Sequence, residues 1–149
     1  MAAYDLRRAT PQDSLALHAL NRSALGPYIE EIYGPWDEEV QTRFHREWFD
    51  ARRLWVIEVA GDLVGVLDCT FHPDGLEVDR ISIDPAHQGL GIGTAVLADL
   101  LELADRRGVP TRLEVFDINP ARRLYERLGF VESNRVGRKI HMVRSTGGR

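Results

Sequence analysis

A glycine-rich stretch holds the residues whose types and spacing point most directly to chemistry. Gly89, Gly91 and Gly93 alternate with apolar residues between a predicted strand that ends at Ile83 and the start of a long predicted helix. Glycine lets the backbone approach a ligand closely, and the free N–H groups at a helix start attract anions. The stretch therefore predicts a phosphate or pyrophosphate site, with a purely structural turn as the alternative.

The spacing of these glycines argues against two common phosphate sites. A P-loop needs a lysine after its last glycine, and no lysine follows Gly93. A dinucleotide fold needs G-x-G-x-x-G near the start of a β-α-β series. The spacing here is G-x-G-x-G, and three predicted antiparallel strands precede it.

Two blocks of the sequence resemble those of the GNAT superfamily of N-acetyltransferases. Gln88-x-x-Gly91-x-Gly93 resembles the Q/R-x-x-G-x-G/A signature of that superfamily. The segment from Asn119 to Phe130, which reads NPARRLYERLGF, is similar to its second block, and the two blocks lie at the family's spacing. The predicted order of elements agrees with the family along nearly the whole chain.

The resemblance implies that acetyl-coenzyme A is the co-substrate; the spacing of the histidines and Cys69 leads us to expect no metal. Backbone amides from Gln88 to Gly93 would hold the pyrophosphate, and the strand end would pair with the pantetheine arm as if the arm were an added strand. A backbone N–H near Ile83 would stabilise negative charge on the thioester oxygen. The cofactor-binding residues implied are Ile81, Ser82, Ile83, Gln88, Gly89, Leu90, Gly91, Ile92, Gly93, Thr94, Asn119 and Ala121.

The same resemblance implies two roles in proton transfer. Tyr125 matches the tyrosine that often protonates the departing thiolate, although it also lies on the apolar stripe of its own helix and would serve as a core aromatic. Glu77 aligns with the base of some family members. Asp79 lies two residues further on the same strand face, and the alternative for both acids is an exposed charged pair.

The implied reaction is direct transfer of the acetyl group from acetyl-CoA to a primary amine, with both substrates bound together. The acceptor remains open between a small-molecule amine and a protein amine. Two other classes of protein compete with this interpretation: a catalytically silent acyl-CoA-binding module, and an interaction domain whose glycine loop is accidental. The second of these would not bind acetyl-CoA.

The elements that must position these residues follow from local patterns. Strands are predicted over 4–9, 54–59, 63–71, 76–83, 111–116, 130–133 and 139–143, from β-branched and aromatic runs bounded by turns. Helices are predicted from Thr10 to Leu25, from there to Phe49 with an interruption at Gly34-Pro35, from Gly93 to Gly108, and from Asn119 to Gly129. Gly26-Pro27 is expected to break the first helix.

These elements predict one α+β domain over residues 1–149. Its sheet is mixed and mostly antiparallel, with about six or seven strands flanked by about four helices. The strand over 111–116 follows its predecessor through a helix, so the two should lie parallel. By resemblance to the GNAT fold, the sheet would splay open at this central parallel pair.

Composition limits the setting and the partners. The chain has 149 residues, a net charge of −4 and one cysteine. We expect a cytoplasmic monomer or homodimer, with no nucleic acid or membrane as partner. Its histidines and Cys69 show no metal-ligand spacing.

Charge is unevenly distributed along the chain. Seven acids lie between Pro27 and Asp50, and eight basic residues follow Pro120. We expect a basic amine as acceptor near the acids, with solvated helix faces as the alternative.

Overall fold

The computed structural model describes residues 3–148, which form two compact units. The first unit comprises the chain up to Asp68 together with Ile81–Ile92. The second comprises Cys69–Arg80 and the chain from Gly93 onward. Strands β3 (Asp62–His72) and β4 (Gly75–Ile83) contribute residues to both units. That residues 1–149 form a single domain stays a prediction.

The strands form a seven-stranded mixed sheet in the order β1-β2-β3-β4-β5-β7-β6. The remaining strands are β1 (Asp5–Arg8), β2 (Trp55–Val59), β5 (Thr111–Phe116), β6 (Val131–Val136) and β7 (Lys139–Arg144). Four α-helices accompany them: α1 (Ser14–Tyr33), α2 (Glu38–Trp48), α3 (Ile92–Arg107) and α4 (Ala121–Arg127). This architecture confirms the predicted fold class.

The predicted parallel pair is present between β4 and β5. Its register joins Leu76 to Thr111, Glu77 to Arg112 and Val78 to Leu113. The ladder thus spans three residue pairs, although β4 has nine residues and β5 has six. That the sheet splays open at this pair stays a prediction.

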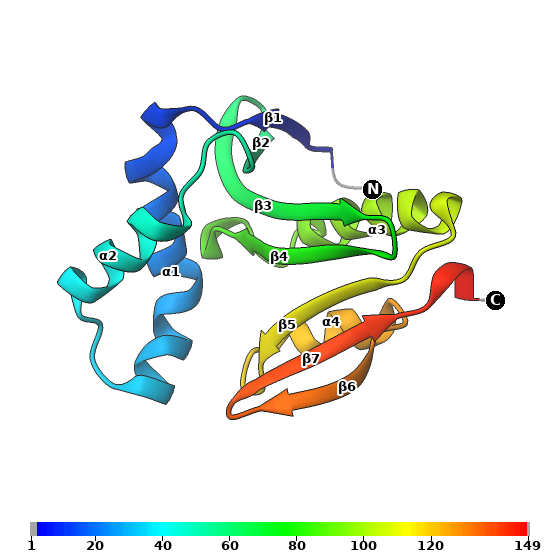
Figure 1. Ribbon diagram of the computed structural model, residues 1–149. Coiled ribbons are helices and arrows are strands. Elements are labelled where there is room, and N and C mark those ends of the chain that lie inside the picture. Colours follow the sequence, from blue (N-terminus) through cyan, green and yellow to red (C-terminus); the bar gives the residue numbers. More distant parts are fainter. Residues whose placement is uncertain (1–2, 149) are drawn as a thin grey trace. The chain divides into compact units, whose positions relative to one another are not determined.

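In the first unit, β1, β2 and β3 pair antiparallel, and α1 and α2 lie beside each other (Figure 1). The start of the helical region is as predicted, although its first turn, Pro11–Asp13, is a 3-10 turn. The Asp13 carboxylate accepts from the Thr10 amide at 2.7 Å and from both terminal nitrogens of Arg7, at 2.9 and 3.0 Å. These bonds tie the end of β1 to the start of α1.

The predicted break at Gly26-Pro27 is wrong, because α1 continues through both residues to Tyr33. Proline's fixed φ suits a helix, and its cost is one lost N–H donor and crowding of the preceding turn. Packing offsets this cost here. A Cβ on Gly26 would lie 3.6 Å from the Trp36 ring, and Glu30 accepts from the Trp36 amide at 3.0 Å. The sequence after α1 therefore packs back on the helix and favours its continuation.

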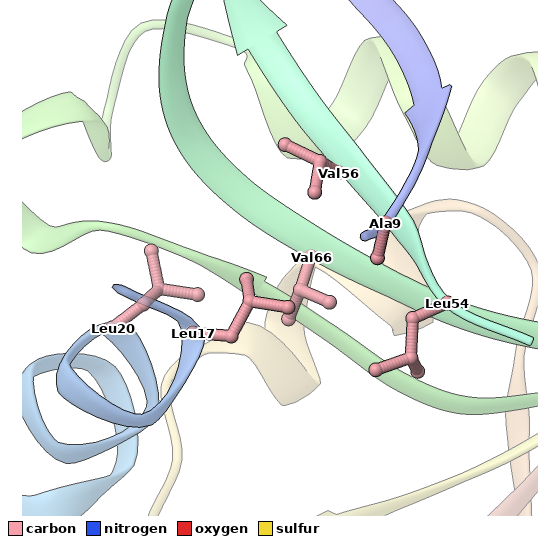
Figure 2. Packing of buried hydrophobic residues seen from close by; sticks show 6 residues of the cluster. All are labelled: Ala9, Leu17, Leu20, Leu54, Val56 and Val66. Atoms are coloured by element: carbon pink, nitrogen blue, oxygen red, sulfur yellow. The ribbon is translucent and has the colours of Figure 1, made fainter. Parts of the chain in front are cut away.

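The core of the first unit is a cluster of aliphatic side chains between α1 and the sheet (Figure 2). Its buried members are Ala9, Leu17, Leu20, Leu54, Val56 and Val66. Trp48 and Phe49, at the end of α2, pack against this cluster. Burial of each leucine contributes about 2 kcal/mol, so the cluster stabilises the packing of α1 on the sheet.

In the second unit, β5, β7 and β6 pair antiparallel, and α4 lies on one face of them (Figure 1). The α3 stripe predicted from the sequence is buried, from Val96 through Leu100 to Ala104. The last pair of strands is longer than predicted at β6, which extends to Val136.

No helix within residues 3–148 combines the length and apolar character needed to cross a membrane.

Candidate active site

The glycine loop leaves its backbone open to solvent in the first unit. Gly89 and Gly91 have φ angles of 79° and 83°, in the left-handed region where a side chain would be strained. Residues from Gln88 to Gly91 are exposed, and α3 begins directly after them at Ile92. Exposed N–H groups before a helix start can receive an anion, and that this loop holds the pyrophosphate of coenzyme A stays a prediction.

Strand β4 ends in the segment that the family resemblance pairs with the pantetheine arm. Ser82 is buried, whereas Ile81 and Ile83 are half-buried. The next residue, Asp84, donates its amide to the Val64 carbonyl at 2.8 Å and accepts from the Ala86 amide at 3.1 Å. These bonds turn the chain out of the strand and toward the glycine loop.

The Gln88 side chain links the loop to the end of this strand. Its Nε2 donates to the Ile83 carbonyl at 2.9 Å. Sequence reasoning used Gln88 for its backbone amide, but that amide donates to the Pro85 carbonyl at 3.3 Å, and the role that the structure gives Gln88 is made by its side chain. The first residue of the glycine signature therefore holds the loop against the strand end.

The remaining predicted cofactor residues lie in the second unit. Gly93 and Thr94 lie in the first turn of α3, where Thr94 is exposed. Asn119 Oδ1 accepts from the Ala121 amide at 2.9 Å, although the N-cap position of α4 is Pro120, one residue later than predicted. The local geometry gives Asn119 and Ala121 a structural role, and their contact with coenzyme A stays a prediction.

Tyr125 is buried in α4 and packs edge-on against Phe130, with ring centroids 5.9 Å apart. Burial raises the pKa of the Tyr125 phenol to about 12. Within residues 3–148, no hydrogen bond to the Tyr125 hydroxyl is present. A phenol with so high a pKa stays protonated at neutral pH, and this is the state that an acid must have before it donates.

Glu77 and Asp79 share one face of β4, as their spacing predicts. Both are exposed, whereas Leu76, before Glu77, and Val78, between the two acids, are buried. The Glu77 carboxylate lies 3.7 Å from Nε2 of His72, which precedes the β3–β4 turn. Glu77 therefore has an imidazole as its neighbour, and the exposed face gives it access to water.

Sequence reasoning missed a third carboxylate on the adjacent strand. Arg112 pairs with Glu77 across the parallel ladder, so Glu114, two residues further, lies on the same side of β5 as Arg112. Glu114 is exposed and lies 3.8 Å from Nε2 of His141 on β7, its partner in the antiparallel register. Its place beside Glu77 depends on the β4–β5 register, which no local pattern of the sequence contains.

The acids between Glu30 and Asp50 are partly engaged in local bonds. The Glu38 carboxylate forms three hydrogen bonds: with the His18 ring at 2.7 Å, the Trp36 indole N–H at 3.0 Å and the Thr42 hydroxyl at 2.9 Å. These bonds lower the pKa of Glu38 to about 2, and the bond with His18 contributes most. Asp37 caps α2 by accepting from the Val40 amide at 3.1 Å.

Among residues 3–148, no group of three or more His, Cys, Asp or Glu side chains is placed to hold a metal ion.

Comparison with known sequences identifies relatives of the chain. The sequence model of the Acetyltransferase (GNAT) family matches residues 17–130. Mycothiol acetyltransferase of Thermomonospora curvata is 37% identical over 123 residues, which cover 80% of this chain and 41% of that protein. The [ribosomal protein bS18]-alanine N-acetyltransferase of Haemophilus influenzae is 36% identical over 88 residues, or 58% of this chain and 59% of that protein. The chain thus spans about two fifths of the mycothiol acetyltransferases that it matches.

Solved structures agree on the fold. The PaiA N-acetyltransferase of Thermoplasma acidophilum, solved in complex with coenzyme A, has a TM-score of 0.77 and 17% identity, and covers 97% of this chain and 99% of that one. An acetyltransferase of Thermus thermophilus has a TM-score of 0.73 at 23% identity, with 97% of both chains covered. Since the family model spans most of the chain and includes both sequence blocks, this chain belongs to the GNAT family of acetyltransferases.

Proposed function

We propose that the chain transfers an acetyl group from acetyl-CoA to a primary amine, by direct attack while both substrates are bound. The observation that carries the proposal is the exposed glycine loop before α3, with Gly89 and Gly91 left-handed, in a chain of the GNAT family. Acetyl-CoA supplies an activated thioester and a thiol leaving group when bound. The protein's part is to orient that thioester and to move protons around it.

In this proposal Tyr125 is the acid. Its phenol is protonated at neutral pH because burial raises its pKa to about 12. A thiol has a pKa of about 8.5, so the departing thiolate needs only modest help and the tyrosine accelerates the reaction without being indispensable.

The base in this proposal is Glu77, acting on the amine directly or through water. Its neighbours on the same face supply the alternatives, Asp79 on β4 and the newly identified Glu114 on β5. Separate Glu77→Gln, Asp79→Asn and Glu114→Gln variants distinguish the three. The variant that removes the base shifts the alkaline rise of kcat/KM with pH, while the other two keep the wild-type profile.

The experiment that tests the function follows thiol release from acetyl-CoA with a panel of primary amines, and identifies the acetylated product by mass spectrometry. Amine-dependent thiol release with a product 42 Da heavier, roughly the mass that an acetyl group adds, supports the enzyme. Acetyl-CoA binding without transfer to any amine would instead support a silent acyl-CoA-binding module. Retained Tyr125 and the acids of β4 favour the enzyme, because a silent module has no use for them.

For the acceptor, we propose a cationic small molecule or peptide with a primary amine. The relatives' names cover mycothiol and an alanine of ribosomal protein bS18, so they do not decide between these classes. The acids of α1 and α2 support a cation. Glu31 is exposed, and Glu38 stays charged down to low pH.

Charge steering is tested by varying salt and one acid at a time. Glu31→Gln suits this test, because Glu30 is already bonded to the Trp36 amide and its replacement would disturb α1. Glu102→Gln, an exposed acid of α3 paired with Arg106, removes the same charge elsewhere and serves as the control. Steering is supported if the KM for polycations rises with salt and rises in Glu31→Gln but not in Glu102→Gln. Preference for an acidic acceptor contradicts it.

We further propose that the protein acts in the cytoplasm as a monomer or homodimer. Its single cysteine supports a reducing compartment. Sedimentation of the purified protein tests the oligomeric state.

A further inference from the structure

The last turn of α4 fixes the place of Tyr125 through its backbone. The Phe130 amide donates to the Tyr125 carbonyl at 3.0 Å, and the Gly129 amide donates to the Glu126 carbonyl at 3.1 Å. Gly129 has a φ of 100°, in the left-handed region. These are the two bonds of a Schellman motif, whose usual apolar contact is made here by the rings of Phe130 and Tyr125. Tyr125 is therefore held by the closure of this turn.

Arg144 of β7 closes the turn from outside the helix. Its Nε donates to the Leu128 carbonyl at 3.0 Å, which would otherwise lack a helical partner at the C-terminus of α4. The Arg144 side chain also lies along Gly129, where a Cβ would meet its Nε at 3.6 Å. A Cβ on residue 129 would make ordinary contact with the Arg144 side chain, so the left-handed φ, and not crowding, favours glycine there.

The guanidinium is itself fixed by a carboxylate. Asp105 of α3 accepts from both terminal nitrogens of Arg144, at 2.9 and 3.2 Å. The Gly147 amide bonds to the same carboxylate. The Arg144 side chain is 15% exposed, so this paired geometry is well shielded from water. Two helices and the segment after β7 thus meet at one ion pair, all within the second unit.

We propose that Arg144, oriented by Asp105, is a positioning residue for Tyr125 in acetyl transfer. The inference rests on the proposed function, in which the Tyr125 phenol is the acid. Arg144 does not touch the reacting atoms. It keeps the C-terminal turn of α4 closed, so that the phenol occupies one place. If the turn opens, the acid is displaced and the rate falls, because a misplacement of about 1 Å is enough to cost up to roughly a hundredfold.

Two variants weaken the clamp without removing a large side chain. Arg144→Lys keeps the charge but cannot bond Asp105 twice and Leu128 at once, because an ammonium lacks the planar fork. Asp105→Asn keeps the shape and leaves Arg144 without its counter-charge. Arg106→Lys is the control, since Arg106 pairs with Glu102 on the exposed side of the same helix.

The first readout does not depend on activity. Amide hydrogen exchange at Gly129 and Phe130 reports the closure of the turn. We expect exchange there to accelerate at least tenfold in Arg144→Lys and Asp105→Asn, with the Arg106→Lys control unchanged. Unaltered exchange at both amides in both variants would overturn the proposal.

The second readout is a double-mutant cycle with Tyr125→Phe. We expect Arg144→Lys to lower kcat about tenfold in the wild type, to leave the acetyl-CoA Kd unchanged, and to have little further effect once Tyr125 is phenylalanine. An equal loss in both backgrounds would show that Arg144 acts independently of Tyr125, and would overturn the positioning role.

Failure of the underlying function is recognised separately. A wild-type protein that transfers no acetyl group overturns the proposed reaction before any variant is made, and the positioning role with it. A transferase in which Tyr125→Phe leaves kcat unchanged, with chemistry rate-limiting, overturns the acid role of Tyr125 and the inference drawn from it, while the transferase activity stands.

Discussion

Replacing Gly65 by alanine should damage both stability and acetyl-CoA binding, because this buried glycine of β3 lies against the strand end predicted to bind pantetheine. A Cβ at this position would lie 2.6 Å from the Ser82 carbonyl oxygen and 2.9 Å from Cδ1 of Ile83. Ordinary contact begins near 3.4 Å, so the Ser82 carbonyl would have to retreat by about 0.8 Å. That atom belongs to the backbone, and it cannot move away without shifting β4.

The expected size follows from this crowding. Overpacking of a core costs about 1–3 kcal/mol, and in a chain of this size each kcal/mol lowers Tm by about 2–4 °C. We also expect the affinity for acetyl-CoA to fall about tenfold, since the displaced residues are those that would pair with the pantetheine arm. Thermal melting followed by titration calorimetry on the folded variant measures both effects.

Gly26→Ala is the matched control, because Gly26 is also a buried glycine with no left-handed φ. Its added Cβ would meet the Trp36 ring at an ordinary 3.6 Å, and alanine favours the helix by about 0.5–1 kcal/mol. The control should therefore keep or raise Tm and leave affinity unchanged. A folded Gly65→Ala protein that binds acetyl-CoA as tightly as the wild type would refute the role given to the end of β4.

Two further predictions concern titrating groups. Tyr125→Phe keeps the ring contact with Phe130 but removes the phenol, so kcat should fall about a hundredfold with little change in acetyl-CoA affinity. Because the pKa of the Tyr125 phenol is about 12, ionisation of this group should not lower the wild-type rate below about pH 10. Stopped-flow single turnovers check the first point and a pH–rate profile the second. The hydrogen bond from Arg7 lowers the pKa of Asp13 from 3.8 to about 2, so its stabilisation is complete above pH 4 and disappears as the pH falls through 2. Asp13→Asn should therefore lower the free energy of unfolding by on the order of 1–2 kcal/mol at pH 7, a figure that is reduced because Arg7 is partly exposed to solvent. Near pH 2 the loss should be far smaller. An equal loss at both pH values, measured by urea titration, would contradict this.

Local patterns predicted most of the fold. The parallel crossing from β4 to β5 followed from the helix between two strands, and the start of α4 followed from Asn119 and Pro120 to within one residue. The glycine loop could be identified because it precedes a long predicted helix and because Gln88-x-x-Gly91-x-Gly93 resembles the family signature. These features depend on residues close together in the chain.

The features that sequence reasoning missed depend on residues far apart. The passage of α1 through Pro27 is favoured by Trp36, which packs on Gly26 from beyond the end of the helix. The link between Arg144 and the end of α4 joins residues 16 apart, and its carboxylate partner Asp105 lies 39 residues away. Glu114 became a candidate only when the β4–β5 register placed it beside the face that carries Glu77. No short-range pattern contains these pairings.

Titration of the protein with acetyl-CoA in a calorimeter, for the wild type and for Gly91→Val, tests the central claim most directly. Gly91 has a φ of 83°, and a β-branched side chain there would both strain the loop and cover its amides. The account predicts binding by the wild type in the micromolar range, about −8 kcal/mol, and a loss of at least tenfold in Gly91→Val. Absence of heat and of any thermal shift for the wild type at millimolar acetyl-CoA would contradict it.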